Sequence, residues 1–312
     1  KESESQLKKA YDLRKRHLGR IHEATVEALD ELNYFYYIFG PGDKFLEGAR
    51  EAHAIALELY GPDDERTVDA VYWAVGGLER VGNYDEAVQE SEEYCRMIEQ
   101  THGPNSLEMA DARLDHAILQ LRAGQVQGAT ANAAEAHEMI QKLENATSSD
   151  QQFARNTYAM LLLVGGRLDE AKKLYGNKRP PVSEAIVSPF QTGSGQPEGD
   201  IRILVFFETW CPFCQRHMPR MERIHQQYGA QGVEVIGLTS VSRSSSDEKV
   251  RAFMAEAGMT HPVFRESGRL SSFFSGYGIP LTVILHQGEV VMEMSGASRI
   301  GQRVIEGLVG AI

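Results

Sequence analysis

The stretch ETWCPFCQRHMP, residues 208–219, holds two cysteines, Cys211 and Cys214, separated by two residues. It follows the apolar run IRILVFF, which predicts a buried strand over 201–207. The residues that follow, 213–229, predict a helix that begins at the cysteine pair. Two cysteines at this spacing can be half of a metal site, a structural disulfide or a working dithiol.

The number of cysteines narrows these alternatives. The chain has three, and the remaining one, Cys95, lies in the other half of the chain, within a predicted helix, where we expect it to be a small buried apolar residue. A closed zinc site needs about four ligands, and the imidazole nearest to the pair is that of His217. We therefore expect no metal. A copper or zinc carrier that uses Cys211, Cys214 and His217 is the alternative.

Downstream of residue 200, predicted strands and helices alternate. The strands are expected at 201–207, 233–239, 261–266, 281–286 and 289–296, and the helices at 213–229, 246–258, 269–278 and 299–312. This order gives βαβ units followed by a hairpin and a terminal helix. It predicts an α/β domain with a central sheet that is covered on both faces.

Further residues place this domain near a known fold. Trp210 precedes the cysteine pair, Pro219 follows it, and Gly278-Ile279-Pro280-Leu281-Thr282 precedes the predicted hairpin. With these features, residues 200–312 resemble the thioredoxin fold, and residues 208–219 are similar to its TlpA/ResA-like branch. The resemblance implies a thiol-disulfide oxidoreductase with a cis-proline loop at Ile279-Pro280. It also implies no cofactor beyond the redox-active Cys211–Cys214 disulfide.

The resemblance further implies a role for each residue of the site. Cys211, at the helix start, would be the exposed nucleophile, because unpaired amide groups there favour a thiolate, and Cys214 would resolve the mixed disulfide. A client chain would bind beside the pair as an added strand. The expected substrate-binding residues are Trp210, Pro212, Phe213, Ile279 and Pro280. The alternative is a protein-binding adaptor whose thioredoxin-like domain is not catalytic.

Two residues are expected to modulate the pair. His217, as an imidazolium, would favour the thiolate, and Glu208 would oppose it. The buried acid of thioredoxins aligns here with Val205, and TlpA/ResA relatives commonly carry an acid where His217 stands, so the direction of electron flow stays open. Glu208 is either a proton relay for Cys214 or a solvated carboxylate paired with a nearby arginine.

The N-terminal part of the sequence repeats with a period of 42 residues. Gly40, Gly82, Gly124 and Gly166 form one series, and Gly19, Gly61, Gly103 and Asn145 form a second, offset by 21. The segments between them have helical periodicity. Together with YGPDD, residues 60–64, they resemble tetratricopeptide (TPR) repeats of the kinesin-light-chain type. The resemblance implies an all-α TPR superhelix over 1–176 that binds a partner protein on its concave face.

Composition completes the domain assignment. Residues 177–199 are rich in Pro, Gly and Ser and predict a linker with one short strand around Ile186 and Val187. Residues 6–18 align with the second helix of later repeats, so either a repeat continues upstream or a lone helix caps the array. The chain therefore predicts two domains, 1–176 and 200–312, joined by this linker.

Charge and hydropathy restrict the partners. Residues 201–312 carry 11 Lys/Arg and 10 Asp/Glu, a balance of +1, so the first 200 residues carry a balance of −13 within the formal net charge of −12. Such acidity argues against nucleic acid or anionic lipid, and it suits either a solvated surface or a basic protein partner. No apolar run is long enough for a membrane span in the given chain. The TlpA-like resemblance implies a periplasmic, extracytoplasmic location, although so few cysteines fit a cytoplasmic chain almost as well.

Overall fold

The computed structural model describes residues 2–191, 199–243, 245–274, 278–296 and 302–310. The chain forms two compact units, Lys1–Thr157 and Tyr158–Ile312. The boundary falls within helix α8, Ser148–Val164. Among the described residues, no helix combines the length and the apolar composition that crossing a bilayer requires.

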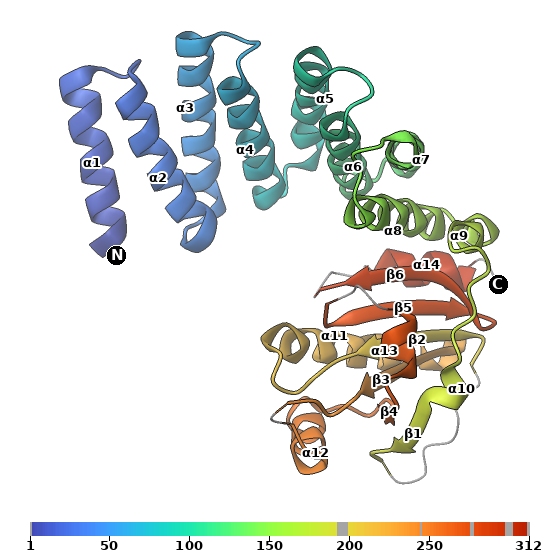
Figure 1. Cartoon of the computed structure of the whole chain (residues 1–312). Helices are drawn as coiled ribbons and strands as arrows, with labels where there is room; N and C mark the ends of the chain where they lie inside the picture. Colours follow the sequence, from blue (N-terminus) through green and yellow to red (C-terminus); the bar gives the residue numbers. More distant parts are fainter. Residues whose placement is uncertain (1, 192–198, 244, 275–277, 297–301, 311–312) are drawn as a thin grey trace. The chain divides into compact units, whose positions relative to one another are not determined.

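The described part of the first unit is helical throughout, as predicted, and its successive helices α1 to α6 lie side by side (Figure 1). The helices are α1 (Glu2–Leu18), α2 (Glu23–Phe39), α3 (Gly42–Tyr60), α4 (Glu65–Val81), α5 (Tyr84–His102), α6 (Leu107–Arg122) and α7 (Val126–Lys142). Helix α4 shows how the repeated residues set the helix ends. The Asp64 side chain caps its first turn, and Gly82, with φ of 80°, ends it in the left-handed conformation.

The second unit contains a mixed six-stranded sheet with the order β1-β4-β3-β2-β5-β6. Strands β2, β3 and β4 are parallel, whereas β5 is antiparallel to β2, β6 to β5, and β1 to β4. The elements after α8 are α9 (Leu168–Leu174), α10 (Val182–Ala185), β1 (Ile186–Pro189), β2 (Ile201–Phe206), α11 (Pro212–Tyr228), β3 (Val233–Thr239), α12 (Asp247–Glu256), β4 (Val263–Glu266), α13 (Arg269–Phe273), β5 (Leu281–His286), β6 (Glu289–Ser295) and α14 (Gln302–Gly310). This arrangement confirms the predicted α/β fold.

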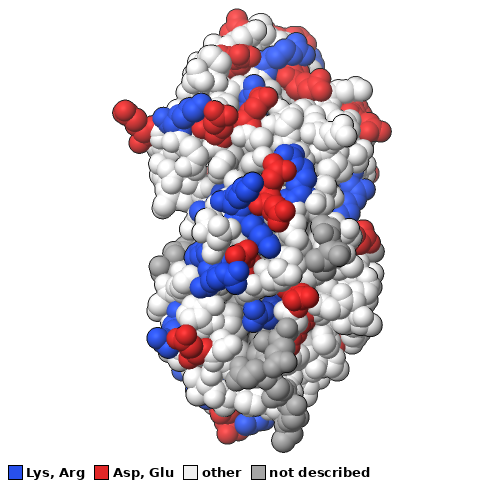
Figure 2. All heavy atoms as spheres, turned by 90° about the vertical axis from the view of Figure 1, so that its right-hand side faces the viewer, with Lys and Arg blue, Asp and Glu red and all other residues white. Residues whose placement is uncertain are grey.

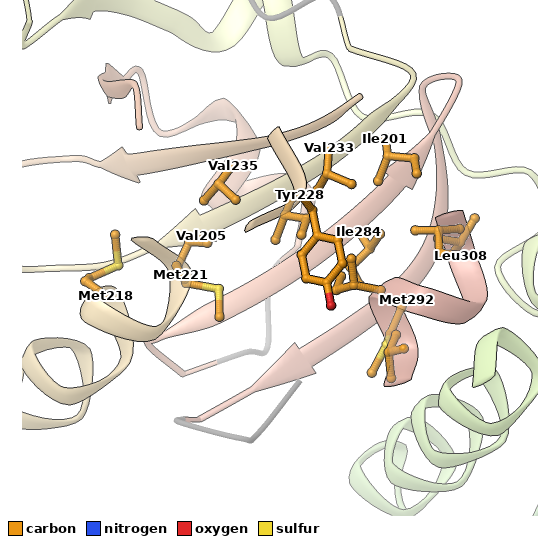
Figure 3. Close-up of a cluster of buried hydrophobic side chains, with 14 of the residues drawn as sticks. Ile201, Val205, Met218, Met221, Tyr228, Val233, Val235, Ile284, Met292 and Leu308 are labelled. Carbon is orange, nitrogen blue, oxygen red and sulfur yellow. The ribbon is translucent and has the colours of Figure 1, made fainter. Parts of the chain in front are cut away.

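The sheet is buried on both faces. Ile203 and Val205 of β2 pack into one cluster with side chains of α11, α12 and α14, whereas Leu204 and Phe206 pack into a second cluster with α10 and α13. Figure 3 shows the first cluster, where residues of the sheet, α11 and α14 gather. Burial on both faces explains why the β2 sequence is continuously apolar rather than alternating.

The division of the chain differs from the predicted one at residues 176 and 200. Leu162, Leu163 and Leu168, which the repeat period assigns to the helical array, are buried in the core of the second unit. The expected short strand is β1, which pairs with β4 as an edge of the sheet. Residues 158–190 are therefore part of the second unit, and the Pro-rich and Ser-rich composition did not reveal this.

Contacts with β6 hold residues 175–179, where the predicted linker begins. The Tyr175 hydroxyl oxygen accepts a hydrogen bond from the Glu293 N–H at 3.1 Å, and the Lys178 ammonium pairs with the Glu293 carboxylate at 2.8 Å. Arg179 pairs with Glu289 at 2.6 Å.

Figure 2 shows Lys and Arg side chains lying among Asp and Glu side chains on the face that it draws, without an extended field of one sign.

Candidate active site

Cys211 stands at the start of α11, directly after the turn that leaves β2. Its backbone N–H donates to the Glu208 carbonyl oxygen at 3.1 Å, and Pro212 occupies the first position of the helix. The Cys211 sulfur accepts a hydrogen bond from the Cys214 N–H, with an Sγ–N distance of 3.4 Å. An amide donor and the helix N-terminus both favour negative charge on this sulfur.

A second segment brings a peptide carbonyl to the same sulfur. The Ile279-Pro280 bond is cis, as predicted, and the Ile279 carbonyl oxygen lies 3.7 Å from the Cys211 Sγ. Strand β5 begins at the next residue, Leu281. The cysteine pair and the backbone just before β5, which are far apart in the sequence, therefore form one site.

Burial distinguishes the two thiols less sharply than predicted. Cys211 was expected to be exposed, but only 4% of its surface is accessible, and its sulfur lies between the Ile279 carbonyl oxygen and the first turn of α11. Cys214 is fully buried. Burial, followed by the hydrogen bond with Cys211, strongly raises the pKa of the Cys214 thiol. Cys214 is thus held as a thiol, which suits a group that reacts second.

His217 does not carry the charge that the sequence suggested. It is fully buried, and its Nε2 lies 3.0 Å from the Thr282 hydroxyl oxygen. Burial, with a smaller contribution from Arg220, lowers the pKa of His217 to about 4. The prediction that His217 carries a positive charge is therefore wrong at neutral pH, because desolvation keeps the ring neutral.

Glu208 is likewise not the solvated carboxylate that was one of the two expectations. It is 4% exposed, and its carboxylate oxygens accept hydrogen bonds from the Ser240 hydroxyl at 3.0 Å and the Ser242 N–H at 3.1 Å. Its negative charge contributes, after larger causes, to the raised pKa of Cys214. Glu208 therefore holds the loop that follows β3, and the effect of its charge on the Cys214 pKa is opposed by the larger, lowering effect of its own backbone.

This loop is the part of the site that the sequence reasoning missed. Val241 and Arg243 have φ of 56° and 55°, a conformation that is a genuine outlier for a β-branched residue. The loop places the Arg243 guanidinium 4.3 Å from the centroid of the Trp210 ring. The available signal was the polar run after Thr239, at the carboxyl end of a parallel strand next to β2.

The predicted substrate-binding residues surround Cys211, although they differ in exposure. Phe213 is 55% exposed, with the Arg216 guanidinium 4.9 Å from its ring centroid, and Pro212 is exposed beside it. Trp210 and Ile279 are half-buried and line a cavity of about 230 Å³ together with Arg243 and Phe274. Pro280 is buried. Among these residues, the ring of Phe213 is thus the one most accessible to solvent.

Within the ranges that the structure describes, no three His, Cys, Asp or Glu side chains are grouped as ligands for a metal ion. Cys95 lies on α5, where burial raises its pKa to about 11. Its side chain is half-buried against the core of the first unit, and not fully buried as expected.

Comparisons with known proteins agree with this geometry. Residues 176–295 match the Redoxin family. The chain is 26% identical over 144 residues to the thioredoxin-like protein YneN of Bacillus subtilis, which covers 43% of this chain and 84% of that protein. It is 33% identical over 103 residues to the thiol-disulfide oxidoreductase ResA of Halalkalibacterium halodurans, covering 32% of this chain and 56% of that protein.

The N-terminal helices have a structural counterpart. The solved structure of nearly identical TPR-like repeats of the kinesin light chain type from Podosopora anserina matches with a TM-score of 0.51 and 16% identity. The match covers 56% of this chain and 83% of that one, and it concerns the fold alone. Together, these findings support a thioredoxin-like oxidoreductase domain in the C-terminal part of the chain and TPR-like repeats in its N-terminal part.

Proposed function

We propose that this protein exchanges thiols and disulfides with protein clients through Cys211 and Cys214, and that the helical repeats recruit a partner protein. One observation carries the proposal. The Cys211 sulfur accepts a hydrogen bond from the Cys214 N–H and lies 3.7 Å from the Ile279 carbonyl oxygen. An attacking sulfur, a resolving thiol and a backbone edge that can pair with an extended client are thus combined in one place.

The proposed reaction has two steps. The Cys211 thiolate attacks one sulfur of a client disulfide, forms a mixed disulfide and releases the other client sulfur as a thiolate that takes up a proton. Cys214 then loses its proton and attacks the Cys211 sulfur, which forms the Cys211–Cys214 disulfide and releases the second client thiol. The client disulfide gains two electrons and two protons, and the protein dithiol loses them. The reverse sequence oxidises a client dithiol.

Single-cysteine variants test this assignment, with insulin as the disulfide substrate and dithiothreitol as the reductant. Cys211→Ser should abolish reduction of insulin. Cys214→Ser should accumulate a mixed disulfide with insulin, visible as a band that disappears on reduction, because the resolving thiol is absent. Cys95→Ser, which removes a thiol outside the site, is the matched control and should retain the activity of the unmodified protein.

The adaptor alternative makes the opposite prediction. If neither cysteine variant changes insulin reduction, and if the Cys211–Cys214 pair does not equilibrate in a glutathione series, the thioredoxin-like domain is a non-catalytic binding module. We further propose an extracytoplasmic location, on the basis of the similarity of residues 208–219 to the TlpA/ResA-like branch. Fractionation of cells that express the natural gene tests the location independently of the activity.

A further inference from the structure

A cavity of about 510 Å³ lies in the first unit between α2, α3 and α4. Its floor is formed by Ala49, Ala52 and Ala56 of α3, all of them buried. Their spacing places these small side chains on one face of the helix, so α3 fills little of the space between the two neighbouring helices. The volume is within the range of sites that hold a ligand side chain or a small molecule.

Aromatic side chains border this cavity. Tyr34 of α2 is 62% exposed and Trp73 of α4 is 40% exposed, and both line it. The Tyr37 ring lies 5.3 Å from that of Trp73, centroid to centroid, in an edge-to-face arrangement that supports the indole from one side. An exposed indole face attracts ammonium and guanidinium groups.

The charged side chains around the cavity are mainly acidic. Glu23, Glu27, Asp30 and Asp69 line it, and Arg66 is the single Lys or Arg among the lining residues. Arg66 is already engaged, since its guanidinium pairs with Asp64 at 2.9 Å and stacks 3.4 Å from the centroid of the Tyr60 ring. The cavity therefore has an excess of negative charge.

Two of these carboxylates are left without a cation. Asp30 and Asp69 form no ion pair among the residues that the structure describes. Solvent reaches Asp30, yet the cavity walls crowd it, and this desolvation together with Glu27 raises the pKa of Asp30 to about 6. Desolvation followed by Glu65 raises the pKa of Asp69 as well. Both carboxylates would be stabilised by an incoming cation.

A neutral group points to the same kind of ligand. Asn33 also lines the cavity and is only 7% exposed, and its Oδ1 accepts no hydrogen bond from any described residue. A Cβ atom at Gly48 would lie 1.8 Å from this oxygen, so the glycine leaves the amide its space. A buried acceptor without a donor is costly, and a ligand N–H would satisfy this oxygen once the Asn33 side chain turns from Gly48 towards the cavity.

We infer that this cavity binds a basic segment of a partner protein, with a Lys or Arg side chain between Asp30 and Asp69 and against Trp73. Glu27, Asp69 and Asp111 recur at intervals of 42 residues, so the repeats carry acidic side chains at equivalent positions on α2, α4 and α6. Acidic side chains that are spread over three helices suit an extended polypeptide better than a small amine. The inference rests on the recruitment part of the proposed function and names the chemistry of the partner.

Binding of a fluorescein-labelled peptide of alternating Lys and Ala to the full chain tests the inference by fluorescence anisotropy. The matched peptides replace Lys by Gln or by Glu. We expect binding of the Lys peptide only, weakened by added salt. The double variant Asp30→Asn, Asp69→Asn should weaken it about tenfold or more. The control Asp43→Asn, Asp85→Asn removes two exposed carboxylates that do not line the cavity and should leave the affinity unchanged.

The location of binding has its own readout. Trp73 and Trp210 are the two tryptophans of the chain, so Trp210→Phe leaves Trp73 as the single emitter. Its emission should change when the Lys peptide binds. Equal loss of affinity in both double variants, or binding without any change in Trp73 emission, would overturn the inference. Competition by spermidine at the same concentration as the peptide would show that a small polyamine, and not a protein segment, is the ligand.

This experiment is separable from the test of the redox reaction. The variant Cys211→Ser, Cys214→Ser should bind the Lys peptide like the unmodified chain, because neither cysteine lies in the first unit. Loss of insulin reduction with intact peptide binding would count against the redox proposal alone. Intact insulin reduction without peptide binding would count against the cavity alone.

Discussion

The pKa of His217 measures how strongly burial in the second unit disfavours a charged side chain. Its folded-state pKa of about 4 lies below the 6.5 of an ordinary histidine. Between these two values the unfolded chain binds a proton that the folded protein does not, so stability falls as the pH falls. The contribution of the neutral His217 ring to the free energy of unfolding is fully present above about pH 6.5 and is lost towards about pH 4. The total is roughly 3 kcal/mol, of which about 2 kcal/mol is lost by pH 5.

The variant His217→Gln removes this titration and keeps a polar group that can bond the Thr282 hydroxyl. Urea unfolding is followed by the fluorescence of Trp210 in a Trp73→Phe background, so that the signal reports the second unit. Stability is compared at pH 7.5 and pH 5.0 for both proteins. Other buried histidines, such as His261, titrate in both and cancel in the comparison.

The expected result is a pH-dependent loss that is about 2 kcal/mol larger for the protein with His217 than for the glutamine variant. Parallel pH dependences in the two proteins would refute the reasoning, because they would mean that the imidazole is solvated or charged in the folded state. A larger loss in the variant would refute it in the opposite sense.

Three further outcomes follow from the same geometry. Iodoacetamide should modify Cys211 at least about tenfold faster than Cys214 at pH 7, as mass mapping can show, since the Cys214 pKa is raised by burial. The fragment 158–312 should fold, as circular dichroism can show. The fragment 200–312 omits three leucines of the core, so its free energy of unfolding should be about 5–9 kcal/mol lower, and the same measurement should show the loss of structure. Glu208→Gln should lower the Cys214 pKa, measured by thiolate absorbance in a Cys211→Ser background. Faster resolution in the single Glu208 variant would indicate a purely electrostatic role, and slower resolution a proton relay.

Local sequence predicted much of this molecule, because helix ends and buried strands leave short-range signals. The repeated glycines mark helix ends such as Gly82, and the run 233–239 coincides with β3. What local signals could not predict depends on contacts between distant residues. The bond between Tyr175 and Glu293, 118 residues apart, makes a presumed linker part of the second unit. The burial of His217 and the bonds of Glu208 to the loop after β3 depend in the same way on segments that lie elsewhere in the sequence.

The packing of α14 on the end of α8 has a consequence for the order in which the chain acquires its structure. A Cβ atom at Gly307 would lie 2.0 Å from the Leu163 carbonyl oxygen, so these two helices approach as closely as a glycine allows. On a ribosome, α1 to α7 can fold from contacts between neighbouring helices as soon as they emerge. The second unit has to wait for α14, since Leu163 belongs to a core that closes only when residues about 140 positions later have been synthesised. During that interval the apolar end of α8 and both cysteines of the site lack the core contacts that bury them in the folded protein.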